Sequence, residues 1–254
     1  MEDKGMNNEV SITALMSSFG RAFHAENEDH PVFADHLAKE LMTAEEYAAV
    51  LTGTKQYVML GADLDTFALR EKEFLSKHRV FEVDHPLTQK DKIERITRAG
   101  WTIPDNLTFV PADFTKDNVA ERLIDGGGDA SVKTFFSWLG VTYYLSTEAI
   151  NTMLAALSEL CADGSSLVFD YPDENFFDAS EKRVQNTIMM AKAGGEPMQS
   201  AFSYSEIEKL LEKHGFLIYE LLTPDDIQRD IIDKAGADMK AFEHVNYCLA
   251  VRKN

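Results

Sequence analysis

The chain has 254 residues, of which 44% are hydrophobic and 27% are charged, a composition typical of a soluble globular protein with one large α/β domain. Its formal net charge of −18 disfavours nucleic acid and anionic membranes as partners, because both are negatively charged. The polar start and the lack of an apolar stretch of ~20 residues argue against a signal peptide or a membrane span, so we expect a cytoplasmic protein. Two distant cysteines and seven scattered histidines show no disulfide or metal-ligand spacing, and no metal is expected.

Seven short apolar runs predict strands. The first five show little alternation between apolar and polar residues, which is typical of strands buried on both faces of a parallel sheet. The runs are YVMLG ending at Gly61, RVFEVD ending at Asp84, LTFVPAD ending at Asp113, KTFFSWLG ending at Gly140, SSLVFDY ending at Tyr171, FLIYELL from Phe216 and VNYCLAVRK from Val245.

Segments with apolar residues at helical spacing separate these runs. We expect helices over residues 64–76, 88–99 and 147–161, and a further helix that ends at His214 and is capped by Ser203 or Ser205. Alternation of strand and helix predicts an open, doubly wound and mostly parallel sheet of seven strands.

Two later stretches depart from this alternation. Only a short helix separates the last two apolar runs, which predicts an antiparallel strand near the carboxy-terminal edge of the sheet. Methyltransferase sheets of class I end in this way, whereas nicotinamide-binding domains usually close with a parallel strand. Residues 171–202 form a long connection, interpreted as a helical lid over the carboxyl ends of the strands or as an amphipathic helix packed on the sheet.

Three polar or glycine signals follow the first three strands, where open α/β sheets bind ligands. Gly61-Ala62-Asp63 could bring the backbone close to a ligand, or it could be a structural turn. Asp84 could accept hydrogen bonds from a ribose diol, or it could cap the next helix. Asp113-Phe114 could bind an adenine, or form a turn and a core residue. Together these signals describe a nucleoside bound across strands one to three.

The chain resembles the leucine carboxyl methyltransferase-like family, in its bacterial branch of S-adenosylmethionine-dependent O-methyltransferases. The resemblance covers nearly the whole chain. It rests on five sequence segments in this order: QYVMLGADLDTFALR, VFEVDHPLTQKDKIERI, LTFVPADF, FFSWLGVTYYLSTEAI and LVFDY. It implies one methyltransferase domain over residues 1–254, with a helical amino-terminal segment over residues 1–55. It also implies S-adenosylmethionine as the cofactor and a carboxylate or hydroxyl oxygen as the methyl acceptor.

The resemblance also implies roles for residues. Gly61, with Ala62 and Asp63, would approach the methionine part of the cofactor, Asp84 with His85 the ribose, and Asp113 with Phe114 the adenine. Leu139, Gly140 and Tyr144 would line the reacting face. Tyr143, Tyr144 and His85 are candidate bases for a hydroxyl acceptor, and Lys92 would brace the loop of Asp84.

Two departures from the family pattern bear on activity. Family members usually read Gly-Ala-Gly where this chain has Asp63, whose carboxylate could repel or pair with charged groups of the cofactor. They also carry a long helical stretch before the first strand, with an arginine that clamps the methionine carboxylate. Here no arginine lies between Arg21 and Arg70, so Arg21 or Lys55 would have to replace it.

The sequence therefore favours a methyltransferase that acts on an oxygen of a small molecule or peptide. One alternative is a relative that binds the cofactor and is catalytically weak or silent. A nicotinamide-dependent oxidoreductase is the other, disfavoured because the chain lacks the G-x-G-x-x-G fingerprint.

Overall fold

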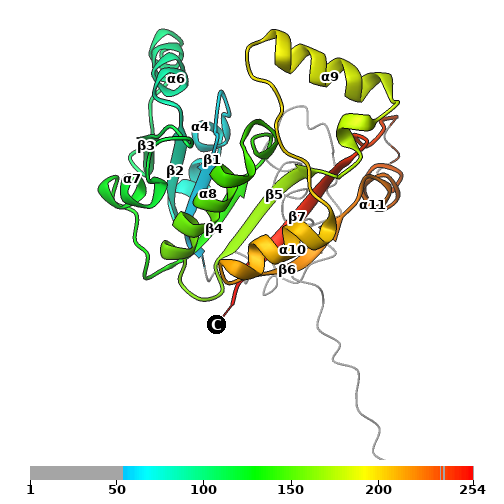
Figure 1. The fold of residues 1–254 in the computed structure, drawn as a ribbon. Coiled ribbons are helices and arrows are strands. Elements are labelled where there is room, and N and C mark those ends of the chain that lie inside the picture. Colours follow the sequence, from blue (N-terminus) through cyan, green and yellow to red (C-terminus); the bar gives the residue numbers. More distant parts are fainter. Residues whose placement is uncertain (1–53, 235, 237, 254) are drawn as a thin grey trace, which may run out of the picture. The chain divides into compact units, whose positions relative to one another are not determined.

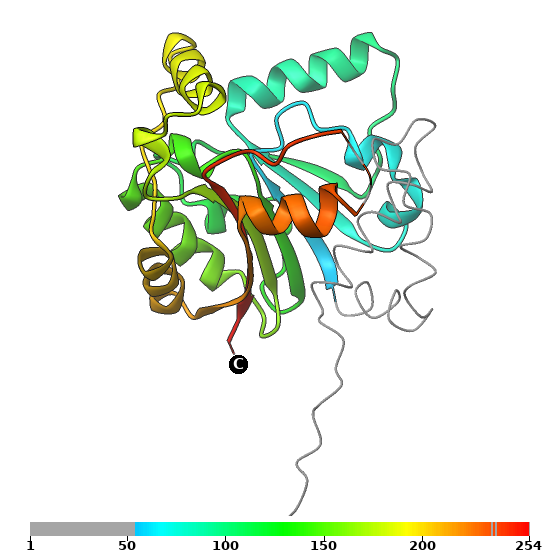
Figure 2. The same ribbon diagram turned by 90° about the vertical axis from the view of Figure 1, so that its right-hand side faces the viewer.

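A computed structural model describes residues 54–234, 236 and 238–253, which belong to one compact unit. At its centre lies a seven-stranded sheet with the strand order β3-β2-β1-β4-β5-β7-β6 (Figures 1 and 2). The first five strands are parallel, and β7 runs antiparallel to both of its neighbours. The strands are β1 (Thr54–Leu60), β2 (Arg79–Asp84), β3 (Leu107–Pro111), β4 (Lys133–Trp138), β5 (Ser166–Pro172), β6 (Phe216–Leu222) and β7 (Val245–Arg252). The predicted fold class is confirmed.

Helical elements connect the strands. They are α4 (Phe67–Arg70), α5 (Lys72–Leu75), α6 (Pro86–Arg98), α7 (Val119–Asp125), η1 (Thr142–Tyr144), α8 (Thr147–Glu159), η2 (Phe176–Asp178), α9 (Lys182–Ala193), α10 (Tyr204–Lys213), α11 (Pro224–Ile227) and η3 (Gln228–Ile232). The prediction of one helix over residues 64–76 was wrong. Glu71 has a non-helical backbone (ψ 61°), so two four-residue helices, α4 and α5, form instead.

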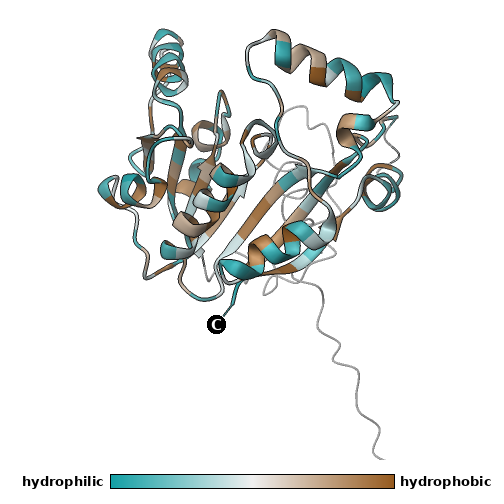
Figure 3. Cartoon of the chain, in the orientation of Figure 1, coloured by the Kyte–Doolittle hydropathy of each residue, from teal (hydrophilic) through white to brown (hydrophobic). Residues whose placement is uncertain are grey.

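The two faces of the sheet have separate hydrophobic cores. The larger core joins one face to α7, α8 and α10, and includes Phe81, Phe136, Trp138 and Leu157, each at most 1% exposed. The opposite face of β1 to β3 packs against α4 and α5. Figure 3 shows the apolar residues on the strands and inner helix faces, with polar residues outside. Strands buried on both faces explain the apolar runs without alternation.

The carboxyl ends of the five parallel strands share one edge of the sheet. Helices α6 and α9 both rise beyond this edge (Figures 1 and 2). Because β7 runs the other way, its first residue also lies there, and the Asp173 N–H after β5 donates to the His244 carbonyl before β7 at 2.9 Å. Loops from distant parts of the sequence therefore meet at one edge.

Helix α9, inside the predicted lid region, packs on these loops. Its buried residue Val184 lies in a small cluster with Phe176, Ala179 and Val245, against which Tyr143 also packs. The residues on its outer face are exposed to solvent, and Met189 and Met190 are 60% and 75% exposed. The helix thus belongs to the edge where the strands end, and its role as a lid stays a prediction.

Candidate functional site

The turn after β1 requires glycine at its first position. Gly61 has a φ of +76°, and a Cβ atom there would lie 2.4 Å from Cγ2 of Val141 in the connection after β4. The Gly61 N–H donates to the Val83 carbonyl at 2.8 Å. The absence of a side chain at Gly61 therefore lets the turns after β1 and β4 touch.

Asp84 ends β2, beside this turn. Its carboxylate accepts hydrogen bonds from the backbone N–H groups of Asp63, at 2.5 Å, and His85, at 2.6 Å. A carboxylate has about four lone-pair sites, so these two bonds leave room for two further donors. Burial raises the pKa of Asp84, and the nearby charge of Asp63 adds to this, while the two backbone bonds and Lys92 oppose it.

The interpretation of Asp84 as a helix cap was wrong. The N-cap of α6 is His85, whose Nδ1 accepts from the Leu87 N–H at 3.3 Å. His85 is exposed. Asp84 lies one residue before the cap, and its side chain turns back toward Asp63.

A buried ion pair joins α6 to β2, the strand that ends at Asp84. The Nζ atom of Lys92, in α6, is 2.6 Å from Oε2 of Glu82, and these side chains are only 5% and 1% exposed. Burial raises the pKa of Glu82 to about 7, against the opposing effect of Lys92. Lys92 therefore holds α6 to β2, and it does so through Glu82, which the sequence analysis did not single out.

Asp113 lies next to Asp84 along the edge. Asp84 is opposite Pro111 in the sheet, and the Ala112 N–H donates to the Asp84 carbonyl at 2.8 Å. The Asp113 carboxylate accepts from Lys116 Nζ at 2.6 Å, and from the hydroxyl and N–H of Thr115 at 2.6 and 3.0 Å. These partners lower its pKa to about 2. One lone-pair site is left for a ligand.

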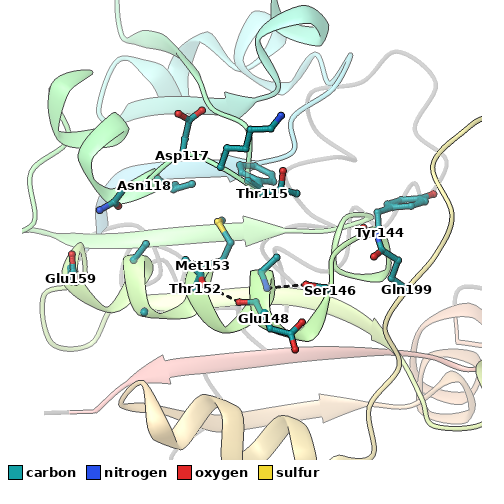
Figure 4. A pocket seen from close by; sticks show the side chains of 16 residues that line it. Thr115, Asp117, Asn118, Tyr144, Ser146, Glu148, Thr152, Met153, Glu159 and Gln199 are labelled. Carbon is teal, nitrogen blue, oxygen red and sulfur yellow. Dashed lines mark hydrogen bonds between the residues drawn. The ribbon is translucent and has the colours of Figure 1, made fainter.

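A groove of about 560 Å³ opens between the β3–α7 connection and α8 (Figure 4). Phe114, in the β3–α7 connection, and Tyr144, before α8, both line it, so the structure brings together two of the predicted site residues. Its other lining residues are Thr115, Lys116, Asp117, Asn118, Val119, Ser146, Glu148, Ala149, Thr152, Met153, Ala155, Ala156, Glu159 and Gln199.

Asp170, in β5, fastens the loop after β4. Its carboxylate accepts from the Gly140 N–H at 2.8 Å and from the Tyr143 hydroxyl at 2.5 Å, and its carbonyl accepts from the Thr142 hydroxyl at 2.5 Å. Burial raises the pKa of Asp170 and of Tyr143. The Tyr143 proton is thus held by a buried carboxylate, which makes this phenol a poor base.

Residues 194–203, which follow α9 and are called the strap below, also hold this loop by hydrogen bonds. The Gln199 N–H donates to the Tyr143 carbonyl at 2.6 Å, and its side-chain amide donates to the Tyr144 carbonyl at 2.7 Å. The buried Ser200 hydroxyl donates to the Thr142 carbonyl at 2.9 Å. Asp170 and Gln199 were not predicted as site residues, although an acid near the end of a buried strand was a signal for the first.

The remaining predicted residues lie as follows. Ala62 is buried, whereas Asp63 and Leu139 are exposed. Gly140 has a φ of +75°, and apart from Gly140 and its two chain neighbours no described residue has an atom within 4 Å of the place where its Cβ would be. Arg21 lies outside the described residues, so its proposed contact with the cofactor stays a prediction.

Comparisons with known proteins identify the family of the chain. The family model described as leucine carboxyl methyltransferase matches residues 47–158. A Bacillus subtilis protein that carries the name putative S-adenosyl-L-methionine-dependent methyltransferase YktD is 37% identical, and the match covers 97% of this chain and 99% of the relative. The chain belongs to the leucine carboxyl methyltransferase-like family of S-adenosylmethionine-dependent methyltransferases.

Solved structures show the same fold. A methyltransferase structure from Thermobifida fusca has a TM-score of 0.56 at 16% identity, covering 95% of this chain and 81% of its own. A protein of the DUF574 family from Streptomyces avermitilis has a TM-score of 0.55 at 17% identity, covering 94% and 83%.

S-Adenosylmethionine is the cofactor of this family member. The residues present fit it, because Asp84 keeps acceptor sites free and the space over Gly140 is open. The alignment with the Bacillus relative spans 302 positions, more than the 254 residues of this chain, so the relative contains residues that this chain lacks.

Two features are absent from the residues that the structure describes. No helix among them is long and apolar enough to cross a membrane. Within the same residues, no group of three or more histidine, cysteine or acidic side chains is placed to hold a metal ion.

Proposed function

We propose that this methyltransferase transfers the methyl group to an oxygen of a small molecule or peptide, either a carboxylate or a hydroxyl. The observation that carries the proposal is the Asp84 carboxylate, which stands at the end of β2 with two backbone donors and free acceptor sites. Ribose hydroxyls can occupy those sites. The adjacent Asp113 and the aromatic Phe114 support an adenine on the same edge.

The cofactor supplies an activated methyl group on a sulfonium, so the protein has to align the acceptor and exclude water. Gly61, Ala62 and Asp63 would approach the methionine part, while Gly140 and Leu139 would face the reacting group. A carboxylate acceptor needs no base. A hydroxyl acceptor benefits from one, and the exposed His85 stays a candidate.

The two tyrosines have different proposed roles. Tyr144 lines the groove, and burial raises its pKa, so its hydroxyl stays protonated near neutral pH and can donate a hydrogen bond to an acceptor oxygen. Tyr143 donates to Asp170 and would act by holding the loop in place. We further propose that residues 171–202 cover the bound acceptor, and that residues 1–55 belong to the same methyltransferase domain.

Calorimetric titration with S-adenosylhomocysteine tests the cofactor site. We expect Asp84→Asn to weaken binding at least about tenfold, because a neutral amide accepts ribose hydrogen bonds less strongly than a carboxylate. Asp91→Asn is the matched control, since Asp91 is an exposed residue of α6 that pairs with Arg95. Equal affinities of the two variants would remove Asp84 from the site.

A second experiment tests the reaction. The wild-type chain is mixed with S-adenosylmethionine and panels of carboxylic acids, phenols and peptides, and formation of S-adenosylhomocysteine is measured. Turnover with either class of oxygen acceptor supports the proposal. Cofactor binding without turnover across all panels would favour the silent relative, and binding of a nicotinamide nucleotide alone would favour the oxidoreductase.

A further inference from the structure

The buried pair of Glu82 and Lys92 is a costly feature in this position. Both side chains lie in the interior between β2 and α6, and the pair makes its 2.6 Å contact without other hydrogen-bond partners among the described residues. A buried ion pair often contributes no more stability than apolar residues of similar size, because each charge loses its water. Stability alone therefore gives no reason for this pair.

The buried pair lies on the same face of β2 as Asp84, the residue proposed to bind the ribose. Glu82 and Asp84 are two residues apart in β2, so their side chains leave the strand on the same face. Helix α6 begins at Pro86, just after Asp84, and returns Lys92 to that face. The Lys92 ammonium, 2.6 Å from the Glu82 carboxylate, thus lies on the face of β2 that also carries the Asp84 side chain.

Among the residues that the structure describes, the other side chain whose charge changes the pKa of Asp84 is acidic. Asp63 follows β1, and its backbone N–H binds the Asp84 carboxylate. The charge of Asp65 raises the pKa of Glu82 further, and His85 is exposed at the N-cap of α6, where its Nδ1 accepts from the Leu87 N–H. Lys92 is the group that brings positive charge to both Glu82 and Asp84.

We propose that Lys92 is a positioning residue for cofactor binding. Its buried ammonium favours the ionised Asp84 carboxylate, which accepts from the ribose hydroxyls. Glu82 shares the positive charge of Lys92. This inference rests on the proposed role of Asp84. Glu82 and Asp84 share the same positive charge, because Lys92 acts on both carboxyl groups. Losing Lys92 should therefore weaken cofactor affinity, whereas losing the Glu82 charge should not.

The test is titration of S-adenosylhomocysteine at several pH values between about 5 and 8, a range in which a raised carboxyl pKa is visible. Lys92→Met should weaken binding about tenfold at neutral pH and move the loss of affinity, seen as pH falls, to a higher pH. Glu82→Gln should leave the affinity unchanged or tighter. Lys90→Met is the matched control, because Lys90 is an exposed lysine of the same helix.

A double variant, Glu82→Gln with Lys92→Met, removes both buried charges and guards against misfolding of the single variants. It should fold and bind as weakly as Lys92→Met. If the pair only holds α6 to β2, both single variants should weaken binding alike and leave the pH midpoint unchanged, which overturns the inference. Unchanged affinity of Lys92→Met or of the double variant also overturns it.

The outcomes separate this inference from the proposed function. A wild-type chain that does not bind S-adenosylhomocysteine overturns both together. Wild-type binding that Asp84→Asn weakens and Lys92→Met does not overturns the inference alone.

Discussion

Asp63 occupies a backbone conformation that suits glycine. Its φ is 38°, in the left-handed region that side chains other than Asn and Asp rarely adopt. Its N–H is needed, because it donates to Asp84, whereas its exposed carboxylate raises the pKa of that same residue. The sequence showed that glycine is missing here, but the direction of the electrostatic effect needed the position of Asp84.

We expect Asp63→Gly to bind S-adenosylhomocysteine more tightly, by a few-fold, because it keeps the N–H and removes the like charge beside Asp84. Asp63→Asn separates the two effects, since asparagine tolerates this φ and is neutral. Weaker binding by both variants in calorimetry would show that the Asp63 carboxylate pairs with the cofactor's ammonium group.

Gly61 permits no side chain. Gly61→Ala should lower the free energy of unfolding by more than about 1 kcal/mol, because it combines an unfavourable φ with a clash against Val141. Denaturant unfolding measures this. Adding Val141→Ala should recover the part due to the clash, and a double variant no more stable than Gly61→Ala would contradict the steric explanation.

Among the elements, the loop between β4 and α8 is held by hydrogen bonds from two distant segments. Asp170 holds Gly140, Thr142 and Tyr143 from the sheet, and the strap after α9 holds the loop's carbonyl groups. The apolar runs predicted the strands that carry this loop, and the resemblance predicted Tyr144. The hydrogen bonds that fix the loop join residues 27 to 58 positions apart, so no local pattern could predict them.

Asp170→Asn should loosen this loop, because its amide cannot accept from the Gly140 N–H and the Tyr143 hydroxyl as strongly as a buried carboxylate. Hydrogen exchange of residues 139–145 should become faster, while exchange in β1 and β2 stays slow. Asp163→Asn, at an exposed position, is the control. Unchanged exchange in the Asp170 variant would show that the strap alone holds the loop.

For the whole molecule, the sequence predicted the sheet and its ending because apolar runs and their spacing determine which segments can be buried. It placed Asp84 and Asp113 at neighbouring strand ends, and the strand order confirms this. It did not predict roles for Glu82 and Gln199, because a single acid inside an apolar run and a glutamine in a long connection occur in many different structural settings. The acidic composition adds a property that no single element shows.

A net charge of −18 produces self-repulsion in the folded state. Raising the sodium chloride concentration from about 20 to about 200 mM shortens the screening length severalfold, so the melting temperature should rise by a few degrees. Differential scanning calorimetry measures this change. A melting temperature that is constant or falls over this range would contradict the explanation.

The position of β7 has a consequence for synthesis. This strand is the last in the chain order, yet it lies between β5 and β6, so β6 has no partner in the sheet until β7 is in place. A ribosome that has released residues up to β6 leaves that strand unpaired, with its edge open to other chains. Completion of the sheet therefore waits for the final segment to leave the exit tunnel.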